Sequence, residues 1–214
     1  MNAKSPRRAL IVIDVQNEYF SGNLQIEYPP VSDSLPKIAR AMDVAAAAGI
    51  PVIVIQQNSP AGGPAFAEGS HGWELHPEVA RRHRDAFFGK PLPSAFADTG
   101  LAAWLDAQGI DTLTVVGYMT HNCNDTTMKH AFDRGMAVEF LHDASGAVSY
   151  ANRAGHATAE EIHRVFMVVE QSRFAAVLSV EEWERCLATG EAPVREDILA
   201  SYANARKLRE AKAA

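Results

Sequence analysis

The chain has 214 residues, 47% of them hydrophobic and 21% charged, a composition that predicts one soluble globular domain with a substantial core. The formal net charge of −6 and the absence of a run of Lys and Arg exclude nucleic acid as a main partner. Two cysteines, Cys123 and Cys186, are too few for a disulfide framework, and neither has the Cys-x-x-Cys spacing of a metal site.

The beginning of the chain shows neither a targeting signal nor a membrane anchor. The apolar run at residues 9–15 is shorter than a signal-peptide core, Asp14 interrupts it, and no small-residue cleavage site follows it. The longer apolar stretches are also too short to cross a bilayer. We therefore expect a cytoplasmic protein that has no membrane partner and keeps its thiols reduced.

Strand-like and helix-like patterns alternate along the chain. The first apolar run is near-continuous, as expected of a strand covered on both faces. Ser32 or Asp33 is the expected cap of the first helix, and Gly49, Gly109 and Gly135 each end a helical pattern. In chain order, the predicted elements are a strand at 9–15, a helix at 33–48, a strand at 51–56, a loop at 57–76, a strand at 85–88, a helix at 99–108, a strand at 112–117, a helix at 123–134, a strand at 136–141, a helix at 158–170, a strand at 174–178 and a helix from 180.

Such repeated alternation predicts βαβ units with right-handed crossovers. The fold class that we expect is α/β, a three-layer α/β/α sandwich around a mainly parallel sheet of about six strands. Because no linker or internal repeat divides the chain, residues 1–214 are predicted to form a single domain, with its core at about 8–187 and a C-terminal arm at 188–214. The segment Ser179-Val-Glu-Glu182 is a capping box that begins the last helix of the core.

Polar residues follow several of the predicted strands. Asp14 lies near the end of the first strand, Lys90 just past the third and Cys123 after the fourth. The carboxyl ends of parallel strands share one edge of the sheet, where α/β proteins bind their ligands. We therefore predict that these three side chains share one site with the loop at 57–76.

Cys123 lies where a buried strand turns into a helix. There its sulfur would be near free backbone N–H groups and the positive end of the helix dipole, both of which favour the thiolate. Two interpretations are open, a reactive nucleophile and a small buried apolar filler. Cys186 lies on a predicted helix and is expected to be structural.

Asp14 stands inside a hydrophobic run, where an unpaired charge would be costly. It is either a helix cap or edge-facing aspartate, or a general acid–base group whose pKa is raised by burial and balanced by a nearby cation. Lys90, between a short strand and a Pro-bracketed loop, is the obvious cation.

Three segments of the chain resemble the signature segments of a known family. They are Val12-Ile-Asp14-Val-Gln-Asn, Lys90-x-x-x-Ser94-Ala-Phe and Gly117-x-x-Thr120-x-x-Cys123. In this order and spacing they look like those of the isochorismatase-like cysteine hydrolases, which include nicotinamidases, N-carbamoyl amine amidohydrolases and ureidoacrylate hydrolases. The resemblance covers about residues 8–180.

The resemblance implies a catalytic triad of Asp14, Lys90 and Cys123. It also implies a cis peptide bond between Tyr118 and Met119, in the turn before the cysteine. Such a turn would aim the N–H groups of Met119 and Cys123 at one point, as an oxyanion hole.

Two departures from the family pattern matter. Many members have Val or a similar apolar residue directly after the cysteine, whereas this chain has Asn124-Asp125. Nicotinamidases carry an Asp-x-His metal-binding segment after the second strand, and this chain has Gln56-Gln-Asn-Ser59 there. His71 and His76 share one loop, but no carboxylate accompanies them in a zinc spacing. We therefore expect no bound metal, no other cofactor and no nicotinamidase activity.

Several aromatic and polar residues are candidates for a substrate pocket. Tyr19, Phe20 and Trp73 lie on loops beside the predicted site, where they either pack within the loops or form the walls of a small pocket. Tyr118 and Thr120, in the turn before the cysteine, complete this set.

His121 lies two residues before Cys123 and allows two interpretations. One is a Cys–His dyad, in which the imidazole activates the thiol. The other is a side chain that lines the pocket or faces solvent, because residues two apart across a sharp turn need not meet.

Together, these residues predict a metal-independent cysteine hydrolase that cleaves an amide-type C–N bond of a small molecule through a thioester. Two alternatives stay open: a vinyl-ether hydrolase of the isochorismatase type that uses Asp14 as its acid, and a non-catalytic small-molecule binder or thiol sensor on the same scaffold. The resemblance also implies a homo-oligomer, a dimer or a tetramer, in which the arm at 188–214 serves contacts.

Overall fold

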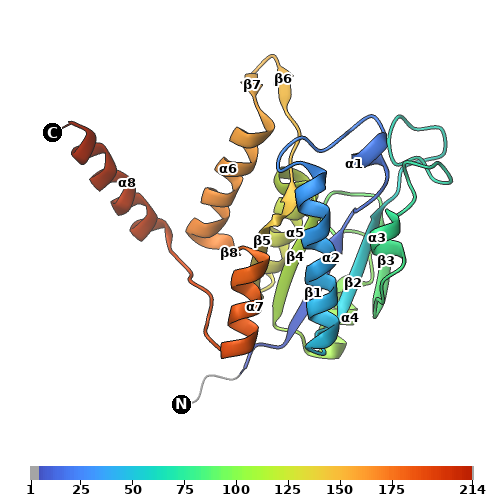
Figure 1. Cartoon of the computed structure of the whole chain (residues 1–214), viewed down its shortest axis with the longest axis horizontal. Coiled ribbons are helices and arrows are strands. Elements are labelled where there is room, and N and C mark those ends of the chain that lie inside the picture. The colour runs from blue at the N-terminus through green and yellow to red at the C-terminus, as the bar shows by residue number, and fades with distance from the viewer. Residues whose placement is uncertain (1–4, 214) are drawn as a thin grey trace.

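A six-stranded parallel sheet with helices on both faces forms the centre of the computed structural model, which describes residues 5–213 (Figure 1). Its strand order is β3-β2-β1-β4-β5-β8. The strands are β1 (Arg8–Ile13), β2 (Val52–Gln57), β3 (Ala86–Lys90), β4 (Thr112–Tyr118), β5 (Ala137–Gly146) and β8 (Ala176–Leu178). The predicted α/β sandwich is therefore confirmed.

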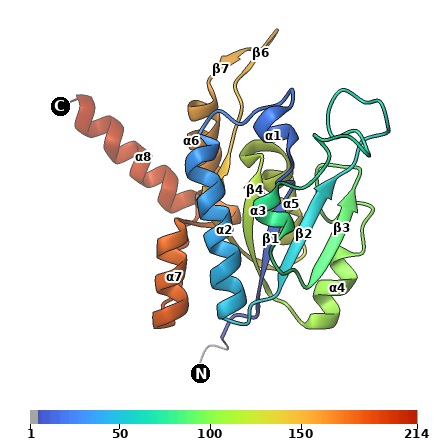
Figure 2. The same cartoon turned by 45° about the vertical axis from the view of Figure 1, so that its right-hand side comes forward.

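Helices cover the two faces of the sheet as two separate layers (Figure 2). Helices α2, α3 and α7 pack on one face, and α4 and α5 pack on the other. The helices are α1 (Glu18–Ser21), α2 (Val31–Ala47), α3 (Pro77–Ala80), α4 (Leu101–Gln108), α5 (Asp125–Asp133), α6 (Ala159–Val169), α7 (Val180–Thr189) and α8 (Ile198–Ala213). Two π-helical turns, Thr120–Asn124 before α5 and Glu170–Phe174 after α6, complete them. Among the described residues, no helix combines the length and the apolar character that a membrane crossing requires.

Strand β1 explains why the first apolar run is continuous. Its Leu10 and Val12 pack with α2 and α7, whereas Ala9, Ile11 and Ile13 pack with α4 and α5. A central strand of a parallel sheet buries both of its faces, so no polar residue can alternate with the apolar ones.

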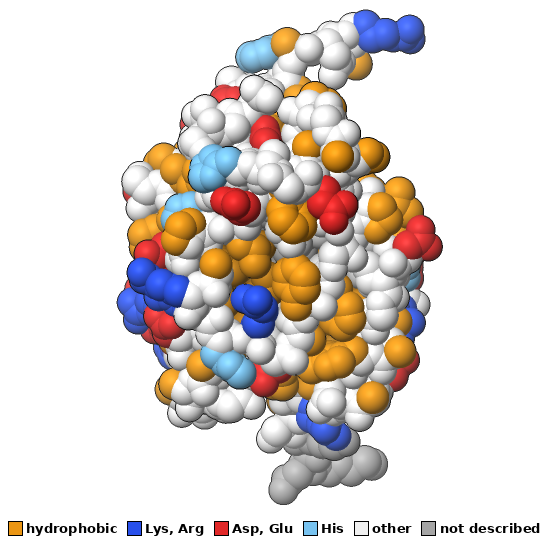
Figure 3. All heavy atoms as spheres, turned by 90° about the vertical axis from the view of Figure 1, so that its right-hand side faces the viewer, with side chains coloured by type: hydrophobic (Ala, Val, Ile, Leu, Met, Phe, Trp, Pro, Cys, Tyr) orange, Lys and Arg blue, Asp and Glu red, His pale blue; other side chains and the backbone are white. Residues whose placement is uncertain are grey.

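Strand β3 forms one edge of the sheet, and this edge faces the viewer in Figure 3. Charged side chains are interspersed among the hydrophobic ones on this face. Phe87 of β3 is partly exposed, and the guanidinium of Arg84 lies 5.4 Å from the centre of its ring. A charged group over an edge strand protects it from pairing with another chain.

The predicted beginning of the first helix is wrong. Helix α2 begins at Val31, directly after Pro30, so Ser32 and Asp33 lie inside its first turn and make no capping hydrogen bond to it. Proline fits this position because its φ is already fixed near the helical value. The acidic Asp33 still favours the positive end of the helix dipole.

The sequence patterns also missed a β-hairpin. Strands β6 (Tyr150–Asn152) and β7 (Gly155–Ala157) pair antiparallel above the sheet. Each strand has three residues, and most of them are exposed, so there is no hydrophobic alternation to detect.

Gly117 lets β4 pass close to β1. Its φ is +104°, and a Cβ at this position would lie 2.1 Å from the carbonyl oxygen of Ile13. Only glycine tolerates both the backbone conformation and the contact. The turn that follows β4 therefore lies directly over the end of β1.

Candidate active site

The strand order places a topological switch point at the carboxyl edge of the sheet. From β1, the chain goes to β2 and β3 on one side and then to β4 on the other, so the order reverses between β1 and β4. Ligand sites of open α/β sheets lie at such a switch point. Asp14 directly follows β1, and Cys123 lies on the turn after β4.

The three predicted catalytic side chains meet at this point. The Nζ atom of Lys90 lies 2.8 Å from Oδ2 of Asp14 and 3.2 Å from Sγ of Cys123. Asp14 and Lys90 are fully buried, and Cys123 is nearly so. The lysine belongs to β3, so its side chain crosses the end of β2 to reach the other two.

Gln57, at the end of β2, is a member of the site that the sequence patterns missed. Its Oε1 accepts a hydrogen bond of 2.5 Å from Lys90 Nζ, and its Nε2 donates to the carbonyl oxygens of Asn58 and Pro91. In β3, Lys90 pairs directly with Gln57. The amide therefore fixes the ammonium group between Asp14 and Cys123.

The backbone of Asp14 is itself unusual. Its φ is +52°, a left-handed conformation that a non-glycine residue seldom adopts. Its N–H donates to the carbonyl oxygen of Ile55, and its own carbonyl oxygen accepts from the N–H of Gln16. The chain leaves β1 through this residue, and such strained positions cluster at functional sites.

Burial and the ion pair shift the pKa values of Asp14 and Lys90 in opposite directions. Burial raises the pKa of Asp14, and the ion pair with Lys90 offsets only part of the rise. Burial lowers the pKa of Lys90, but the charges of Asp14 and Cys123 raise it by more, so it lies above its ordinary value. Asp14 is thus a carboxylate that accepts a proton more readily than an exposed one, beside a lysine that stays charged.

The expectation that the fold favours a Cys123 thiolate is wrong for the free protein. Burial raises the pKa of this thiol well above its ordinary value, and the carboxylate of Asp14 raises it further, whereas Lys90 lowers it. Cys123 lies inside the π-helical turn and not at the first residue of α5. Desolvation therefore outweighs the helix dipole, and the resting cysteine carries its proton.

A buried polar network holds the turn that carries Cys123. The side-chain nitrogen of Asn124 donates to the carbonyl oxygen of Gly117 and to the hydroxyl of Ser145, at 2.8 and 2.9 Å. The hydroxyl of Thr120 lies 2.8 Å from that of Ser145 and 2.8 Å from Nδ1 of His163. The departure of Asn124 from the family pattern therefore has a structural role, and Thr120 faces this network.

His163 of α6 contributes a neutral imidazole to the network. Burial, together with the positive character of the neighbouring histidines, lowers its pKa to about 4. At neutral pH, the ring accepts or donates hydrogen bonds without carrying a charge. It thus links α6 to the turn.

The peptide bond between Tyr118 and Met119 is cis. Among the described residues, the N–H of Met119 has no hydrogen-bond acceptor. Its carbonyl oxygen accepts from the N–H groups of Asn122 and Asn124, which closes the turn. The oxyanion hole of Met119 and Cys123 stays a prediction. Of its two N–H groups, that of Met119 has no acceptor among the described residues.

Aromatic rings pack around Tyr19, close to Asp14 and Cys123. Tyr19 packs edge-on against Phe66 and Tyr118, with ring centres 5.1 and 5.4 Å apart. Phe20 lies 4.3 Å from the ring of His76 and 5.9 Å from that of Tyr118. The hydroxyl of Tyr118 itself is 2.8 Å from Ser34 Oγ in α2, so it points away from the cysteine.

Tyr150, on the missed hairpin, is a further neighbour of the site. Burial and then the charge of Cys123 raise its pKa, and the same two causes raise the pKa of Tyr19. Both phenols therefore lie near the thiol. No sequence pattern indicated Tyr150 as a site residue, because this segment returns to the carboxyl edge of the sheet only in the tertiary fold.

His121 packs between the hairpin and α6. Its ring lies 5.1 Å from that of Tyr150 and 6.0 Å from that of Phe166. Neither ring nitrogen has a hydrogen-bond partner among the described residues, and burial lowers the pKa of the imidazole. These contacts favour a position of His121 in the wall of the pocket over a role in a Cys–His dyad.

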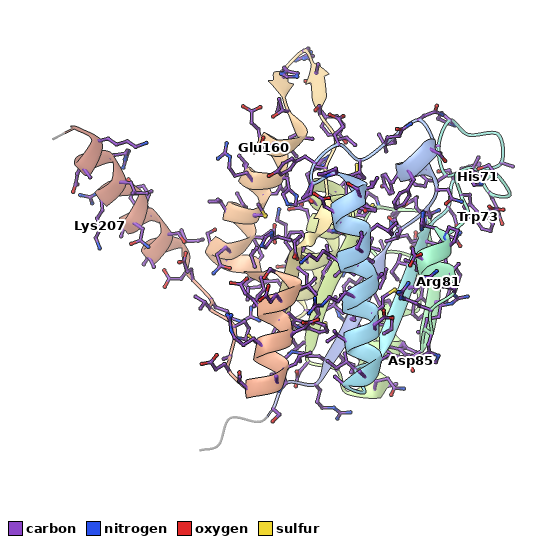
Figure 4. The ribbon with its side chains drawn as sticks, in the orientation of Figure 1. His71, Trp73, Arg81, Asp85, Glu160 and Lys207 are labelled. Atoms are coloured by element: carbon purple, nitrogen blue, oxygen red, sulfur yellow. The ribbon has the colours of Figure 1, made fainter. Side chains whose placement is uncertain are left out.

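Trp73 lies on the outer loop, beside His71 (Figure 4). Its indole N–H donates to Oδ1 of Asn58 at 2.8 Å, and its carbonyl oxygen accepts from the side chains of Gln16 and Gln56. These bonds tie the loop to the ends of β1 and β2. The contacts are those of loop packing, and a place for Trp73 in the pocket stays a prediction.

The segment after β2 offers amides where nicotinamidases carry metal ligands. Gln56 donates to Trp73, and Gln57 accepts from Lys90. Zinc in proteins binds thiolate, imidazole and carboxylate groups. The donor set of this segment therefore does not fit such a metal.

Comparisons with known proteins agree with this geometry. The sequence model described as "Isochorismatase domain" matches residues 8–182. The crystal structure of a Burkholderia xenovorans LB400 protein assigned to the isochorismatases is 60% identical and covers 97% of this chain and 100% of its own, with a TM-score of 0.95. The ureidoacrylate amidohydrolase RutB of Methylobacterium radiotolerans is 31% identical over 88% of this chain and 83% of its own length.

A secreted isochorismatase effector of Verticillium dahliae is 33% identical over 67% of this chain and 75% of its own length. Because one relative is named as secreted, the cytoplasmic location of this chain stays a prediction.

Proposed function

Since the chain belongs to the isochorismatase family of hydrolases, we propose that it is a metal-independent cysteine hydrolase that cleaves an amide-type C–N bond of a small molecule. The observation that carries the proposal is the buried lysine that bridges a carboxylate and a thiol, at 2.8 and 3.2 Å. A hydrolase that attacks through a thiol needs a base beside it, and Asp14 has the raised pKa that suits this task. The amidohydrolase activity of the relative RutB supports the same bond type.

The first step forms the bond between the enzyme and its substrate. Asp14 accepts the proton of the Cys123 thiol, and Sγ attacks the carbonyl carbon of the amide. The π electrons of the carbonyl move to its oxygen, which the N–H groups of Met119 and Cys123 stabilise. Because the resting thiol is protonated, proton transfer and attack are coupled, and the buried Lys90 offsets the negative charge that moves between the two groups.

The second step breaks the C–N bond. The tetrahedral intermediate collapses, Asp14 gives its proton to the nitrogen, and ammonia or an amine leaves. Cys123 is then a thioester. Asp14 next takes a proton from water, whose oxygen attacks the thioester carbon. The acid product leaves, and the thiolate takes the proton back from Asp14.

The rings near the proposed triad support a small substrate with an apolar part. Tyr19 packs against Phe66, Phe20 packs against Tyr118, and His121 packs against Tyr150. Small-molecule sites combine such apolar walls with a few polar groups that orient the ligand. We propose that the hydroxyls of Tyr19 and Tyr150 orient a small amide, urea or carbamoyl amine over Cys123.

A screen for released ammonia over primary amides, ureas and carbamoyl amines tests the proposal. The wild type should turn over at least one compound, and Cys123→Ala should lose at least about two orders of magnitude in rate. Cys186→Ala, which removes the other buried thiol, is the matched control and should keep the wild-type rate.

Mass spectrometry of the quenched reaction should find the acyl group on the peptide that contains Cys123. If Cys123→Ala hydrolyses a confirmed substrate at the wild-type rate, the covalent mechanism is wrong, and acid catalysis by Asp14 alone, as in a vinyl-ether hydrolase, takes its place.

A further inference from the structure

A cavity lies between α1 and the loop that follows β2, and none of the three proposed triad residues lines it. Its volume is about 340 Å³. The backbone N–H of Glu18 donates to the carbonyl oxygen of Gly72, which joins α1 to the loop. Figures 1 and 2 show the two segments side by side, and Figure 4 shows His71 on the loop. The polar residues that line the cavity are Glu18, Ser21, Asn23, Ser70 and His71.

Glu18 places a buried carboxylate in the wall of this cavity. Only 5% of the residue is exposed. Its Oε1 accepts a hydrogen bond of 2.6 Å from the N–H of Asn23, whereas its Oε2 accepts none from the described residues. The ion pair of this loop joins His71 to Glu74 and leaves Glu18 out. A buried anion without a cation beside it is costly, so the free oxygen calls for a partner.

Two glycines make room for the carboxylate. A Cβ on Gly22 would lie 2.5 Å from Cδ of Glu18, and a Cβ on Gly72 would lie 2.3 Å from its Oε2. These distances are too short for any side chain, so another residue at either position would displace the carboxyl group. Two separate segments of the chain therefore accommodate the anion at this place.

The cavity adjoins the proposed active site through two aromatic rings. Phe66 lines the cavity and packs against Tyr19, with ring centres 5.1 Å apart. Tyr19 is the residue after Glu18 in α1. Burial, and then the charges of Cys123 and Asp14, raise the pKa of this phenol, and the charge of Glu18 contributes as well. The carboxylate of Glu18 and the thiol of Cys123 are therefore both near the same phenol.

The chemistry of the cavity favours a positively charged organic group. A desolvated carboxylate with a free oxygen binds an ammonium or guanidinium group through a charge-assisted hydrogen bond. The ring of Phe66 offers a surface that cations also favour. A metal ion fits less well, because the described residues contain no group of three or more potential metal ligands. The formal net charge of −6 attracts cations to the protein.

We propose that this cavity binds an ammonium or guanidinium group of the substrate, so that the enzyme prefers small amides that carry a positive charge. The preference rests on the proposed function, since Cys123 attacks the amide of the same molecule whose charged end Glu18 binds. Glu18 contacts no reacting atom. Its charge therefore selects the substrate and leaves the chemistry of the amide unchanged.

Matched pairs of substrates test the preference. A series of ω-aminoalkanamides differs from the unbranched alkanamides of the same length only in a terminal ammonium group. For the wild type, at least one charged amide should have a kcat/KM at least about tenfold above that of its neutral partner, as expected for one charge-assisted hydrogen bond. Glu18→Gln keeps an acceptor for the N–H of Asn23 and should lose this preference, while its rates on the neutral amides stay within a few-fold of the wild type.

Glu74→Gln is the matched control. It removes the same charge from the same loop, but Glu74 is exposed and does not line the cavity. The variant should keep the preference for the charged amides. Equal kcat/KM values for charged and neutral partners in the wild type would overturn the proposal, and so would a preference that Glu18→Gln leaves unchanged.

A binding measurement separates the cavity from the reaction. Calorimetric titration with butylammonium and butylguanidinium chloride, against potassium chloride at the same ionic strength, should show one site in the wild type. Glu18→Gln should bind these cations at least about tenfold more weakly. Such binding without turnover of any amide would support the cation site and reject the proposed reaction. Turnover of neutral amides without binding of either cation would overturn the cation site and leave the amidase intact.

Discussion

Two buried ion pairs occupy opposite ends of the sheet and differ in how completely their carboxylates are bonded. At the amino ends, Arg8 contacts Glu139 through Nε and Nη2, at 2.8 to 3.0 Å. Glu139 also accepts from the hydroxyl of Thr114 and the indole of Trp183. At the carboxyl ends, Asp14 has Lys90 and the thiol of Cys123 beside it.

The difference separates a structural ion pair from the one that we propose to be catalytic. Four donor atoms, two from Arg8 and one each from Thr114 and Trp183, bind the carboxylate of Glu139. Asp14 is equally buried but has fewer hydrogen-bond donors around it. Its pKa therefore rises, and the carboxylate can accept and release a proton. Burial alone therefore does not identify a carboxylate that acts as an acid–base group. The number of hydrogen-bond donors around the carboxylate distinguishes the two cases.

Asp14→Asn is expected to have the largest effect on activity. The amide cannot accept the thiol proton, so kcat should fall by at least about two orders of magnitude. In the wild type, the acid limb of kcat/KM should lie above the ordinary range of an aspartate, because Asp14 must lose its proton before it can act and burial raises its pKa. Rates on a substrate from the screen, measured across pH, check both statements. A kcat for Asp14→Asn within a few-fold of the wild type would contradict the assigned role.

Glu139→Gln is the matched substitution at the other end of the sheet. It leaves Arg8 without its anion, and breaking a buried pair should cost about 3 kcal/mol, the low end for such changes. For a chain of this size the melting temperature should fall by roughly 6–12 °C. The kcat of the folded variant should stay within a few-fold of the wild type. A large loss of kcat without a loss of stability would remove the distinction between the two pairs.

Glu170 is a third buried carboxylate, and its substitution is expected to have a smaller effect, which is on stability. Burial, with a contribution from Asp125, raises its pKa to about 8. The folded protein therefore holds a proton that the unfolded chain has lost between pH 4.5 and 8, and this contribution to stability disappears as the pH rises through about 8. Glu170→Gln removes the dependence.

The melting temperature of Glu170→Gln relative to the wild type should accordingly rise from pH 5 to pH 9. Glu160→Gln changes an exposed glutamate of the neighbouring α6 and should show a constant difference across the same range. Equal pH profiles for Glu170→Gln and the wild type would mean that Glu170 is ionised in the folded protein.

The residues of the proposed triad could be placed together because each lies at or just beyond the end of a strand. A parallel sheet brings the carboxyl ends of its strands to one edge, so Asp14, Lys90 and Cys123 were placed together by the strand pattern alone. The family resemblance, confirmed by the match over residues 8–182, gave their roles as expectations. Gln57 and Tyr150 had no such signal, since a polar residue at a strand end and an exposed tyrosine are both common.

The sequence by itself determined the α/β fold class, the family and the residues gathered at one edge, because apolar periodicity and glycine positions report on local structure. The tertiary structure decided the protonation of the site. Whether Cys123 is a thiol or a thiolate depends on how much water its neighbours exclude, and those neighbours come from β1, β3 and the hairpin. It also decided that Leu199, Tyr202 and Leu208 of α8 are exposed, since a helical pattern does not specify what the helix packs against.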